Sequence, residues 1–496
     1  MTESEGTESE GTESEGTESE GTEPQSRVDP FTRLCYGIGS VAYGVKDNGF
    51  GYFLLYYYNQ VLGLSSKQAS IAIFIALLID ALSDPIVGNL SDRLHSRWGR
   101  RHPFMYASAI PIALSFYLLW NPPVLSQPEL FYYLITMAVL VRTFLTFFEV
   151  PSTALAPELT ESYDERTMLS TIRHFCGYAG GITIAAVAYQ FLLAPTKAYP
   201  VGQLNPAGYQ LYGLLGSAMM LGSILLSSLG THHRIPALKQ PPPKQHRSLH
   251  VIVRETKETL SNRSFLSIFG FGIFSAMGAG FAGAMSIYIY TYFWALPADV
   301  ISTLVLSGIL SALLAAFAAP VAARRMGKKN AAMAFAVLAG FSYPMPVVLR
   351  LFDMMPENGT DTLIWVLVAF NVWAVALIIS AATLVSAMMA DIVEESELAT
   401  GRRSEGIFFA ARSFISKSLT GLGIVFSAAV LELIEFPAQV RPRELDPDII
   451  WRLGACYAPL LLGLFLISMA CLSAYQLTRE QHEANVAELE ERAKEI

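Results

Sequence analysis

Charged residues are scarce in this 496-residue chain: Asp, Glu, Lys and Arg make up only 15% of it, whereas 52% is hydrophobic. This composition is too apolar for one soluble globule and is typical of a protein with many membrane spans. The chain also has only four cysteines, in or beside apolar segments and without CxxC spacing: Cys35, Cys176, Cys456 and Cys471. We expect them to be small apolar residues in helices, not disulfides or metal ligands.

Enzyme motifs are also missing from the chain. It has no Walker loop and no convincing GxSxG or HExxH, and His232-His233 lies in a basic linker, where a solvated pair is favoured over a metal site. We therefore expect neither an enzyme nor a bound cofactor. No basic stretch with a short apolar core precedes the first long apolar run, so we expect no cleavable signal peptide.

Positive charge is absent from the first 23 residues, which hold four TESEG repeats followed by TE. Without their nine Glu, the net charge of −8 becomes +1. Such a segment has no apolar surface to bury. We expect residues 1–26 to be a disordered acidic tail or an added tag, outside the folded part.

Long hydrophobic runs, in contrast, recur along the rest of the chain. Runs of about 20 residues or more are long enough to span a bilayer as helices. We expect an all-α membrane protein with twelve spans, at about 34–62, 69–91, 103–121, 130–156, 170–193, 207–230, 264–293, 299–322, 330–351, 362–390, 406–434 and 450–477.

The basic residues between these runs alternate. Most follow the even-numbered runs, as in Arg93 to Arg101, Arg234 to Arg263 and Arg324 to Lys329. By the positive-inside rule, both termini are expected to be cytoplasmic, in a plasma (inner) membrane protein.

A linker at 232–263, with three successive prolines, separates the runs into two sets of six. The sequence RWGRR at 97–101 is echoed by RMGKK at 325–329, at the same place in each set. We expect six-helix bundles at 27–231 and 264–477, followed by a charged cytoplasmic tail at 478–496. Two such halves around a central cavity describe the major facilitator fold.

Two acids lie inside the second apolar run. Asp80 and Asp84 are four residues apart, so they project from one face of a helix. An ionised carboxylate in hydrocarbon costs several kcal/mol. We expect the pair to bind a cation, for which carboxylate oxygens suit Na⁺, or to hold a proton. The alternative is a simple ion pair with a neighbouring Arg or Lys. The pair suggests an ion-coupled transporter.

Several motifs then occur in a fixed order: GVKD at 44–47, YYY at 56–58 with GLS at 63–65, DALSDPIVG at 80–88 with RWGR at 97–100, EVP at 149–151, ADIV at 390–393 and Lys417. Together they resemble the glycoside–pentoside–hexuronide:cation symporters, over about residues 31–477. The resemblance implies the major facilitator fold and adds Ser83 and Thr146 to Asp80 and Asp84 as cation ligands.

Other ionisable residues in apolar runs are candidates for binding a polar solute. Lys46, Asp47, Glu149 and Arg173 offer charge-assisted hydrogen bonds to hydroxyl groups, and the resemblance places such groups around the sugar. Lys46 and Asp47 are alternatively a structural ion pair. Thr153 stands where the family has an aromatic platform for the sugar ring, so we include it in the site.

Two further basic residues in apolar runs have more than one predicted role. Arg142 is predicted either to neutralise Glu149 or the acids of the second run, or to bind an anionic substrate. Lys417 is a lone cation in an apolar run. The related sodium-dependent lysophospholipid symporters use such a lysine for the lipid phosphate, but they lack the Lys-Asp pair of the first run.

The basic cluster Arg97, Arg100 and Arg101 and the acids Asp391 and Glu394 are predicted to share one side of the membrane. They form a cytoplasmic gate between the halves or, alternatively, a solvated charged face.

We expect a monomeric symporter, without nucleic acid, whose partners are a sugar-like, glycoside or uronide solute, Na⁺ or H⁺, and membrane lipid. The alternatives are a sodium-dependent symporter of lysolipids or other amphipathic anions, and a uniporter or a non-transporting sensor.

Overall fold

The computed structural model describes residues 28–160, 162–238, 263–400 and 405–477, together with a few positions beyond 477. The acidic tail predicted at 1–26, most of the linker and most of the tail at 478–496 lie outside the described residues. Within the described part the chain is helical, and no strand occurs there.

The first predicted span is a succession of short helices with two π-helical turns, η1 and η2, and the other spans of the first half are longer. The elements are α1 (Pro30–Ile38), α2 (Val41–Asn48), η1 (Gly49–Phe53), α3 (Leu54–Tyr56), η2 (Tyr57–Val61), α4 (Ser66–Arg93), α5 (His102–Trp120), α6 (Gln127–Ala154), α7 (Ala156–Leu159), α8 (Tyr163–Val187), η3 (Ala188–Leu192), η4 (Gly202–Leu204), α9 (Pro206–His232) and η5 (Ile235–Ala237).

The second half repeats this plan after the linker, again with a π-helical turn, η6, at the end of its first span. Its elements are α11 (Arg263–Tyr288), η6 (Ile289–Phe293), α12 (Ala298–Met326), α13 (Lys328–Ser342), α14 (Met345–Leu351), α15 (Asp361–Thr400), α16 (Glu405–Leu433) and α17 (Pro447–Ser473).

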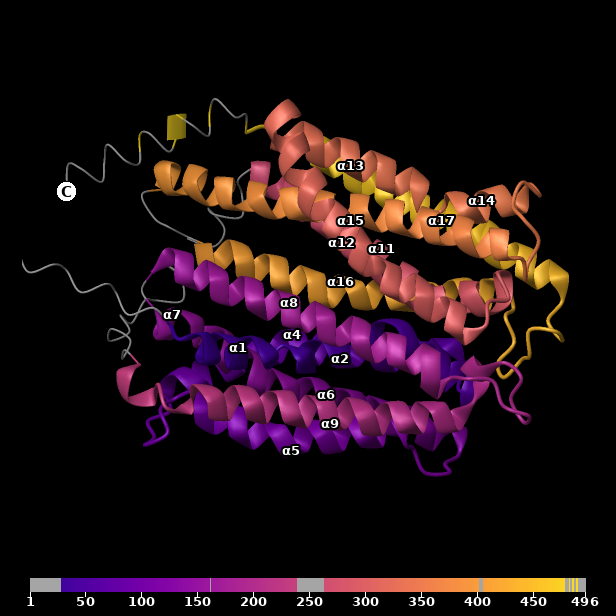
Figure 1. Ribbon diagram of the computed structural model, residues 1–496, viewed down its shortest axis with the longest axis horizontal. Helices are drawn as coiled ribbons and strands as arrows, with labels where there is room; N and C mark the ends of the chain where they lie inside the picture. The colour runs from indigo at the N-terminus through magenta and orange to yellow at the C-terminus, as the bar shows by residue number, and fades with distance from the viewer. Residues whose placement is uncertain are drawn as a thin grey trace, which may run out of the picture.

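Every predicted span coincides with helix. In the described residues, ten helices are long and apolar enough to cross a membrane, and the apolar part of α16, Ser418–Leu433, is shorter. The remaining span is the interrupted first one. The all-α fold of two helical bundles is therefore confirmed. Figure 1 shows α1–α9 on one side and α11–α17 on the other; we call them the N-terminal and C-terminal halves.

Helix ends follow ordinary capping chemistry. The side chains of Asp29, Ser65, Asn205 and Asp446 accept hydrogen bonds from backbone N–H groups in the first turns of α1, α4, α9 and α17. Ser126 begins α6 with a reciprocal capping box to Glu129. These five helices therefore start where a polar residue satisfies free N–H groups.

Glycine allows the closest helix contacts in both halves. A Cβ at Gly44 of α2 would lie 1.9 Å from the carbonyl oxygen of Gly177 in α8, and one at Gly280 of α11 would lie 2.1 Å from that of Thr420 in α16. Membrane helices use small residues in this way to bring backbones together. The first and fifth spans of each half thus pack alike, as a duplicated unit predicts.

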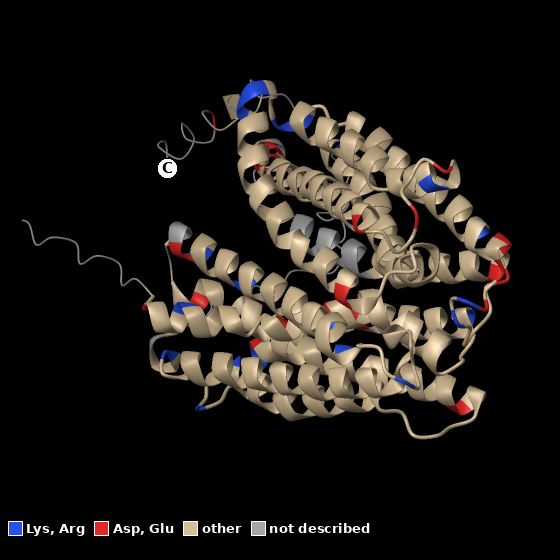
Figure 2. Ribbon diagram, turned by 45° about the vertical axis from the view of Figure 1, so that its right-hand side comes forward, with Lys and Arg blue, Asp and Glu red and all other residues tan. Residues whose placement is uncertain are grey.

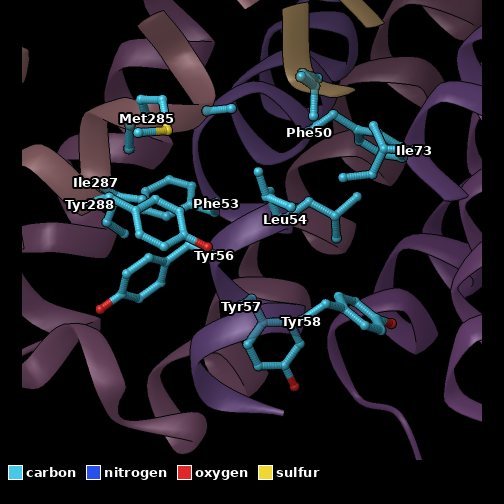
Figure 3. Packing of buried hydrophobic residues seen from close by; sticks show 14 of the residues in the cluster. Phe50, Phe53, Leu54, Tyr56, Tyr57, Tyr58, Ile73, Met285, Ile287 and Tyr288 are labelled. Atoms are coloured by element: carbon cyan, nitrogen blue, oxygen red, sulfur yellow. The ribbon is translucent and has the colours of Figure 1, made fainter. Parts of the chain in front are cut away.

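The helices expose apolar side chains along most of their length. Figure 2 shows Lys, Arg, Asp and Glu mainly toward helix ends, with a smaller group inside the N-terminal half. The largest core cluster joins both halves and includes Tyr56 and Tyr288, whose ring centroids are 5.1 Å apart (Figure 3). Each half therefore contributes aromatic rings to a shared core.

Candidate functional site

The two acids of α4 meet α6 at a single threonine. The Thr146 hydroxyl lies 2.8 Å from Asp80 Oδ1 and 3.2 Å from Asp84 Oδ1. The Ser83 hydroxyl donates to the Asp80 carbonyl at 2.9 Å and lies 3.5 Å from the Thr146 hydroxyl. The structure thus brings together all four residues that the sequence assigns to cation binding.

A single hydroxyl has one proton to donate, so Thr146 cannot satisfy both carboxylates at once. Asp80 is buried and Asp84 is half-buried, inside a membrane span. Asp80 also pairs with Arg142. In the described residues, no group of three or more His, Cys, Asp and Glu side chains is placed to hold a metal. A cation here would therefore need hydroxyl as well as carboxylate oxygens.

Arg142 of α6 pairs with Asp80 of α4. Its Nη1 donates to Asp80 Oδ2 at 2.7 Å, and both side chains are about 5% exposed. Its guanidinium carbon is also 4.8 Å from the Phe50 ring centroid, within cation–π range. Of the two roles predicted for Arg142, the described contacts correspond to neutralisation of an acid of the second span.

A separate cavity of about 340 Å³ lies between α2, α6 and α8. Asp47, Glu149 and Arg173 line it, so three of the predicted substrate residues come together. Arg173 is oriented by a 2.9 Å hydrogen bond from its Nη1 to the Ser152 hydroxyl. This volume is at the lower end of the range that small-molecule sites occupy.

Lys46 lies beside this cavity but does not line it. Its Nζ is 2.8 Å from Asp47 Oδ1 and 4.3 Å from the Tyr43 ring centroid, and its side chain is only 4% exposed against 50% for Asp47. The pair therefore neutralises Lys46 and leaves much of the Asp47 carboxylate accessible in the cavity. This geometry is compatible with both roles predicted for Lys46 and Asp47, a structural ion pair and contact with the solute.

Two other predicted residues stand apart. Thr153 is exposed and is not among the residues that line this cavity. Lys417 belongs to α16, but its side chain lies outside the described residues.

Aromatic surface is supplied instead by two tyrosines that the sequence analysis missed. Tyr43 and Tyr178 line the charged cavity, as do Asn48 and His174. Helical spacing could have identified them. Tyr43 precedes Asp47 by four residues and Tyr178 follows His174 by four, so each tyrosine shares a helix face with a polar residue of the cavity.

Three of the five predicted gate residues, Arg100, Arg101 and Asp391, form ion pairs within their own halves in this conformation. Glu158 Oε1 accepts from Arg100 Nη2 at 2.6 Å and from Arg101 Nε at 3.0 Å, whereas Arg97 is exposed. In the C-terminal half, Lys328 Nζ is 2.7 Å from Asp391 Oδ1, and Glu394 follows on the same helix. These pairs lie at the end where α1 begins and α17 ends, which we call the terminal end; bridges between the halves there remain a prediction.

The opposite end, which carries residues 59–64 and 437–440, is joined across the halves, and we call it the closed end. Gln60 is buried there: its Nε2 donates to the Pro437 carbonyl at 3.1 Å, and its Oε1 accepts from the Tyr292 hydroxyl at 2.9 Å. The Tyr288 hydroxyl donates to Asn59 Oδ1 at 2.9 Å. Neutral amides and phenols therefore hold the two halves together at this end.

The closed end also reveals a second internal repeat. Residues 56–64, YYYNQVLGL, correspond to residues 288–296, YIYTYFWAL. Both segments contain a π-helical turn, and both end in a residue with positive φ, Gly63 at 81° and Ala295 at 49°, followed by leucine. The spaced tyrosines and the final leucine were readable from the sequence as a repeat.

The family model described as MFS/sugar transport protein matches residues 35–479. A putative glycoside/cation symporter of Escherichia coli is 24% identical, over 91% of this chain and 93% of its own length. A glucuronide carrier protein homologue of the same organism is 24% identical, over 92% and 95%. The sodium-dependent lysophosphatidylcholine symporter 1 of Gallus gallus is 22% identical, over 94% and 90%.

Among solved structures, a bacterial homologue of the human lysosomal transporter Spinster superposes with a TM-score of 0.61 at 13% identity, covering 92% of this chain and 99% of that one. This likeness confirms the major facilitator fold. The family match spans most of the chain and confirms the resemblance to the glycoside–pentoside–hexuronide:cation symporters. The chain belongs to the MFS/sugar transport protein family and is an integral membrane protein.

Proposed function

We propose that this member of the MFS/sugar transport protein family is a secondary symporter, which couples entry of a polar, hydroxylated solute to a cation gradient. The observation that carries the proposal is the pair Asp80 and Asp84 around one Thr146 hydroxyl, inside a membrane span. Family members are transporters, and the names of two relatives include the word symporter. Catalysis is accordingly not part of the proposal.

The cation site consists of Asp80, Ser83, Asp84 and Thr146, with Na⁺ or H⁺ as the coupling ion. Arg142 supplies one positive charge against the two aspartates. A bound cation or proton would compete with Arg142 for Asp80. Binding at this site therefore changes the charge at the contact of α4 with α6, which is how a ligand shifts a two-state equilibrium.

The solute site is the charged cavity of Asp47, Glu149 and Arg173, with Lys46 positioning Asp47. Carboxylates and a guanidinium around a cavity suit the hydroxyl groups of a sugar-like solute. A lysolipid symporter is the alternative that the Gallus gallus relative raises. The Lys46–Asp47 pair at the cavity wall favours the hydroxylated solute instead.

Transport then proceeds by alternating access in the plasma membrane, with both termini cytoplasmic. The closed end separates, and at the terminal end the basic cluster meets Asp391 and Glu394 across the halves. We propose that the protein works as a monomer. Basic residues at the terminal end agree with the cytoplasmic assignment through the positive-inside rule.

Uptake into proteoliposomes tests the coupling. A radiolabelled glycoside should accumulate with an inward Na⁺ or H⁺ gradient, and Asp84→Asn should reduce this accumulation by about 5–150-fold while exchange of the glycoside persists. The matched control is Asp353→Asn, because Asp353 is exposed in a loop and its φ of 56° is one that Asn also adopts.

Each failure of this experiment identifies a different alternative. Exchange without any gradient dependence in the unaltered protein indicates a uniporter, and no exchange indicates a sensor. A thermal-shift screen with glycosides, uronides and lysolipids, each with and without Na⁺ at two pH values, separates the solute classes, because a ligand that binds the folded protein raises its melting temperature.

A further inference from the structure

Two more cavities continue from the charged one toward the C-terminal half. The second, of about 180 Å³, shares Asn48 and Tyr178 with the charged cavity. The third, of about 60 Å³, shares Tyr290, Tyr343 and Asn371 with the second. The three therefore adjoin in one series, which begins among charges in the N-terminal half and ends among apolar residues of the C-terminal half.

The middle cavity has tyrosines from both halves in its wall. About half of the surface of Tyr52 and Tyr178 is uncovered although both lie at the interface of the halves. Such uncovered ring faces bind flat apolar groups by stacking. The tyrosines are Tyr52, Tyr178 and Tyr189 from the N-terminal half and Tyr290 and Tyr343 from the C-terminal half.

Two amides mark the borders of this tyrosine cavity. Asn48 Nδ2 donates to the Gly44 carbonyl at 3.2 Å, and Asn371 Nδ2 donates to the Leu304 carbonyl and the Ser307 hydroxyl at 3.1 and 2.9 Å. These bonds fix the orientation of both side chains. The amide oxygen is the acceptor that each can still offer to a hydroxyl group of a bound molecule.

The charges that line the charged cavity decide whether it binds a neutral or an anionic part of a solute. Lys46 neutralises Asp47. The other charges among the lining residues are the guanidinium of Arg173, which already donates to Ser152, and the carboxylate of Glu149. The cavity therefore offers no excess positive charge to an anion. Its carboxylates are acceptors, which suit a neutral group rich in hydroxyls.

We propose that the series of cavities forms one two-part site, which binds a neutral glycosyl head among Asp47, Glu149 and Arg173 and a flat aromatic aglycone among the tyrosines between the halves. The substrate class is then a neutral aryl glycoside, in preference to a free sugar or an aryl uronide. This inference rests on the proposed function and specifies its solute.

Gly308 makes the room for the aglycone. A Cβ at this position would lie 3.6 Å from the Tyr178 hydroxyl, an ordinary contact distance. Gly308→Ala therefore fits, whereas the longer side chain of Gly308→Leu would fill the tyrosine cavity. Gly463 in α17 has nothing within 4 Å of such a Cβ, so Gly463→Leu is the matched control.

The experiment measures binding of 4-nitrophenyl β-glucoside, 4-nitrophenyl β-glucuronide and glucose to the purified full chain by thermal shift and calorimetry. We expect the aryl glucoside to bind at least about tenfold more tightly than glucose and than the glucuronide. Gly308→Leu should remove that advantage over glucose without weakening glucose binding, while Gly308→Ala and Gly463→Leu should keep it.

The other outcomes overturn the inference in separable ways. If glucose binds as tightly as its aryl glucoside, or if Gly308→Leu weakens both equally, the aromatic part of the site is wrong but the proposed function stands. If the glucuronide binds more tightly, the charge argument is wrong. If none of the three compounds binds, the proposed function fails together with the inference.

Discussion

The two ends of this molecule are held together by different chemistry. At the closed end, neutral amides and phenols of Gln60, Tyr288 and Tyr292 bond across the halves. At the terminal end, ion pairs such as Glu158 with Arg100 and Lys328 with Asp391 join elements of the same half.

This difference fits the alternating access proposed above. In that cycle a contact between the halves would break and re-form each time, and a neutral hydrogen bond has a net value of only about 0.5–1.5 kcal/mol. Breaking a buried ion pair by removing one partner costs about 3–5 kcal/mol. Ion pairs are therefore suited to keeping each half rigid, and neutral hydrogen bonds to a joint that opens.

The largest effect is expected at the terminal end. Glu158→Ala leaves Arg100 without this partner in a buried setting, since the Glu158 side chain is only 8% exposed. Arg101 also loses this partner but keeps its 2.7 Å pair with Asp92. We expect a loss of about 3–5 kcal/mol, seen as a fall in folded protein and in melting temperature. In Lys328→Ala the lost cation is 40% exposed, so the cost should be about 1 kcal/mol or less. Equal losses in the two variants would contradict this ranking.

At the closed end, Gln60→Leu should open the joint with little loss of folded protein. It removes the donor to the Pro437 carbonyl and the acceptor of the Val440 N–H group. The Tyr292 hydroxyl keeps its other acceptor, the Val440 carbonyl at 2.9 Å. Each buried group left unpaired costs about 1–3 kcal/mol, so the open form should gain roughly tenfold or more in population.

A cysteine placed in this joint reports its opening. Thr291 is buried and its hydroxyl has no hydrogen-bond partner in the described part of the chain, so Thr291→Cys loses no bond there. Maleimide labelling, in a chain without the native cysteines, should be faster with Gln60→Leu. Gln127→Leu is the control, because Gln127 is exposed and its weak 3.5 Å contact to the Leu62 carbonyl stays within one half. If Gln60→Leu leaves the labelling rate of the cysteine at 291 unchanged, the Gln60 bonds do not hold the closed end together.

A smaller effect is expected from single hydroxyl groups. Tyr292→Phe removes a bond across the halves to Gln60, and Tyr133→Phe removes a 2.8 Å bond to the Leu118 carbonyl inside one half. Both should cost about 1 kcal/mol of stability, but only Tyr292→Phe should speed labelling of the cysteine at 291, by about fivefold. If Tyr292→Phe and Tyr133→Phe give similar labelling rates, bonds across the halves do not differ in this respect from bonds within one half.

The smallest effect on stability is expected at the positive-φ residue that precedes the final leucine of each repeat at the closed end. Gly63 has a φ of 81° and Ala295 one of 49°. A left-handed conformation costs an L-residue about 1–2 kcal/mol, so Ala295→Gly should raise stability by about 0.5–1 kcal/mol, and Gly63→Ala should lower it. Melting temperatures check both, and a lower value for Ala295→Gly would contradict the assignment.

The sequence predicted the spans well because hydrophobic length is a local property. Four-residue spacing and a family resemblance grouped Asp80, Asp84 and Thr146, and the structure brings these side chains together at the contact of α4 with α6. The sequence left the partner of Arg142 open, since periodicity tells which face a residue occupies but not which helix lies opposite. That choice depends on the packing of α6 against α4, which brings Arg142 to Asp80.

The closed-end joint and the tyrosine cavity were not predicted at all. Gln60 and Tyr292 are 232 residues apart, and neither is unusual in an apolar run. Only the approach of the two halves gives them a role. The gate pairs show the same limit: charge patterns placed them at one end, but the partners depend on the conformation described.

One measurement tests most directly whether transport requires the closed end to open. A Cβ at Gly63 would lie 2.8 Å from Gln439 Cδ, so Gly63→Cys with Gln439→Cys is the pair we choose to cross-link the halves at this end. In a chain without the four native cysteines, oxidation should stop glycoside uptake in proteoliposomes, and a reductant should restore it, with both single variants insensitive to oxidant. If the fully oxidised double variant transports as fast as its reduced form, the closed end does not open during transport and the account is wrong.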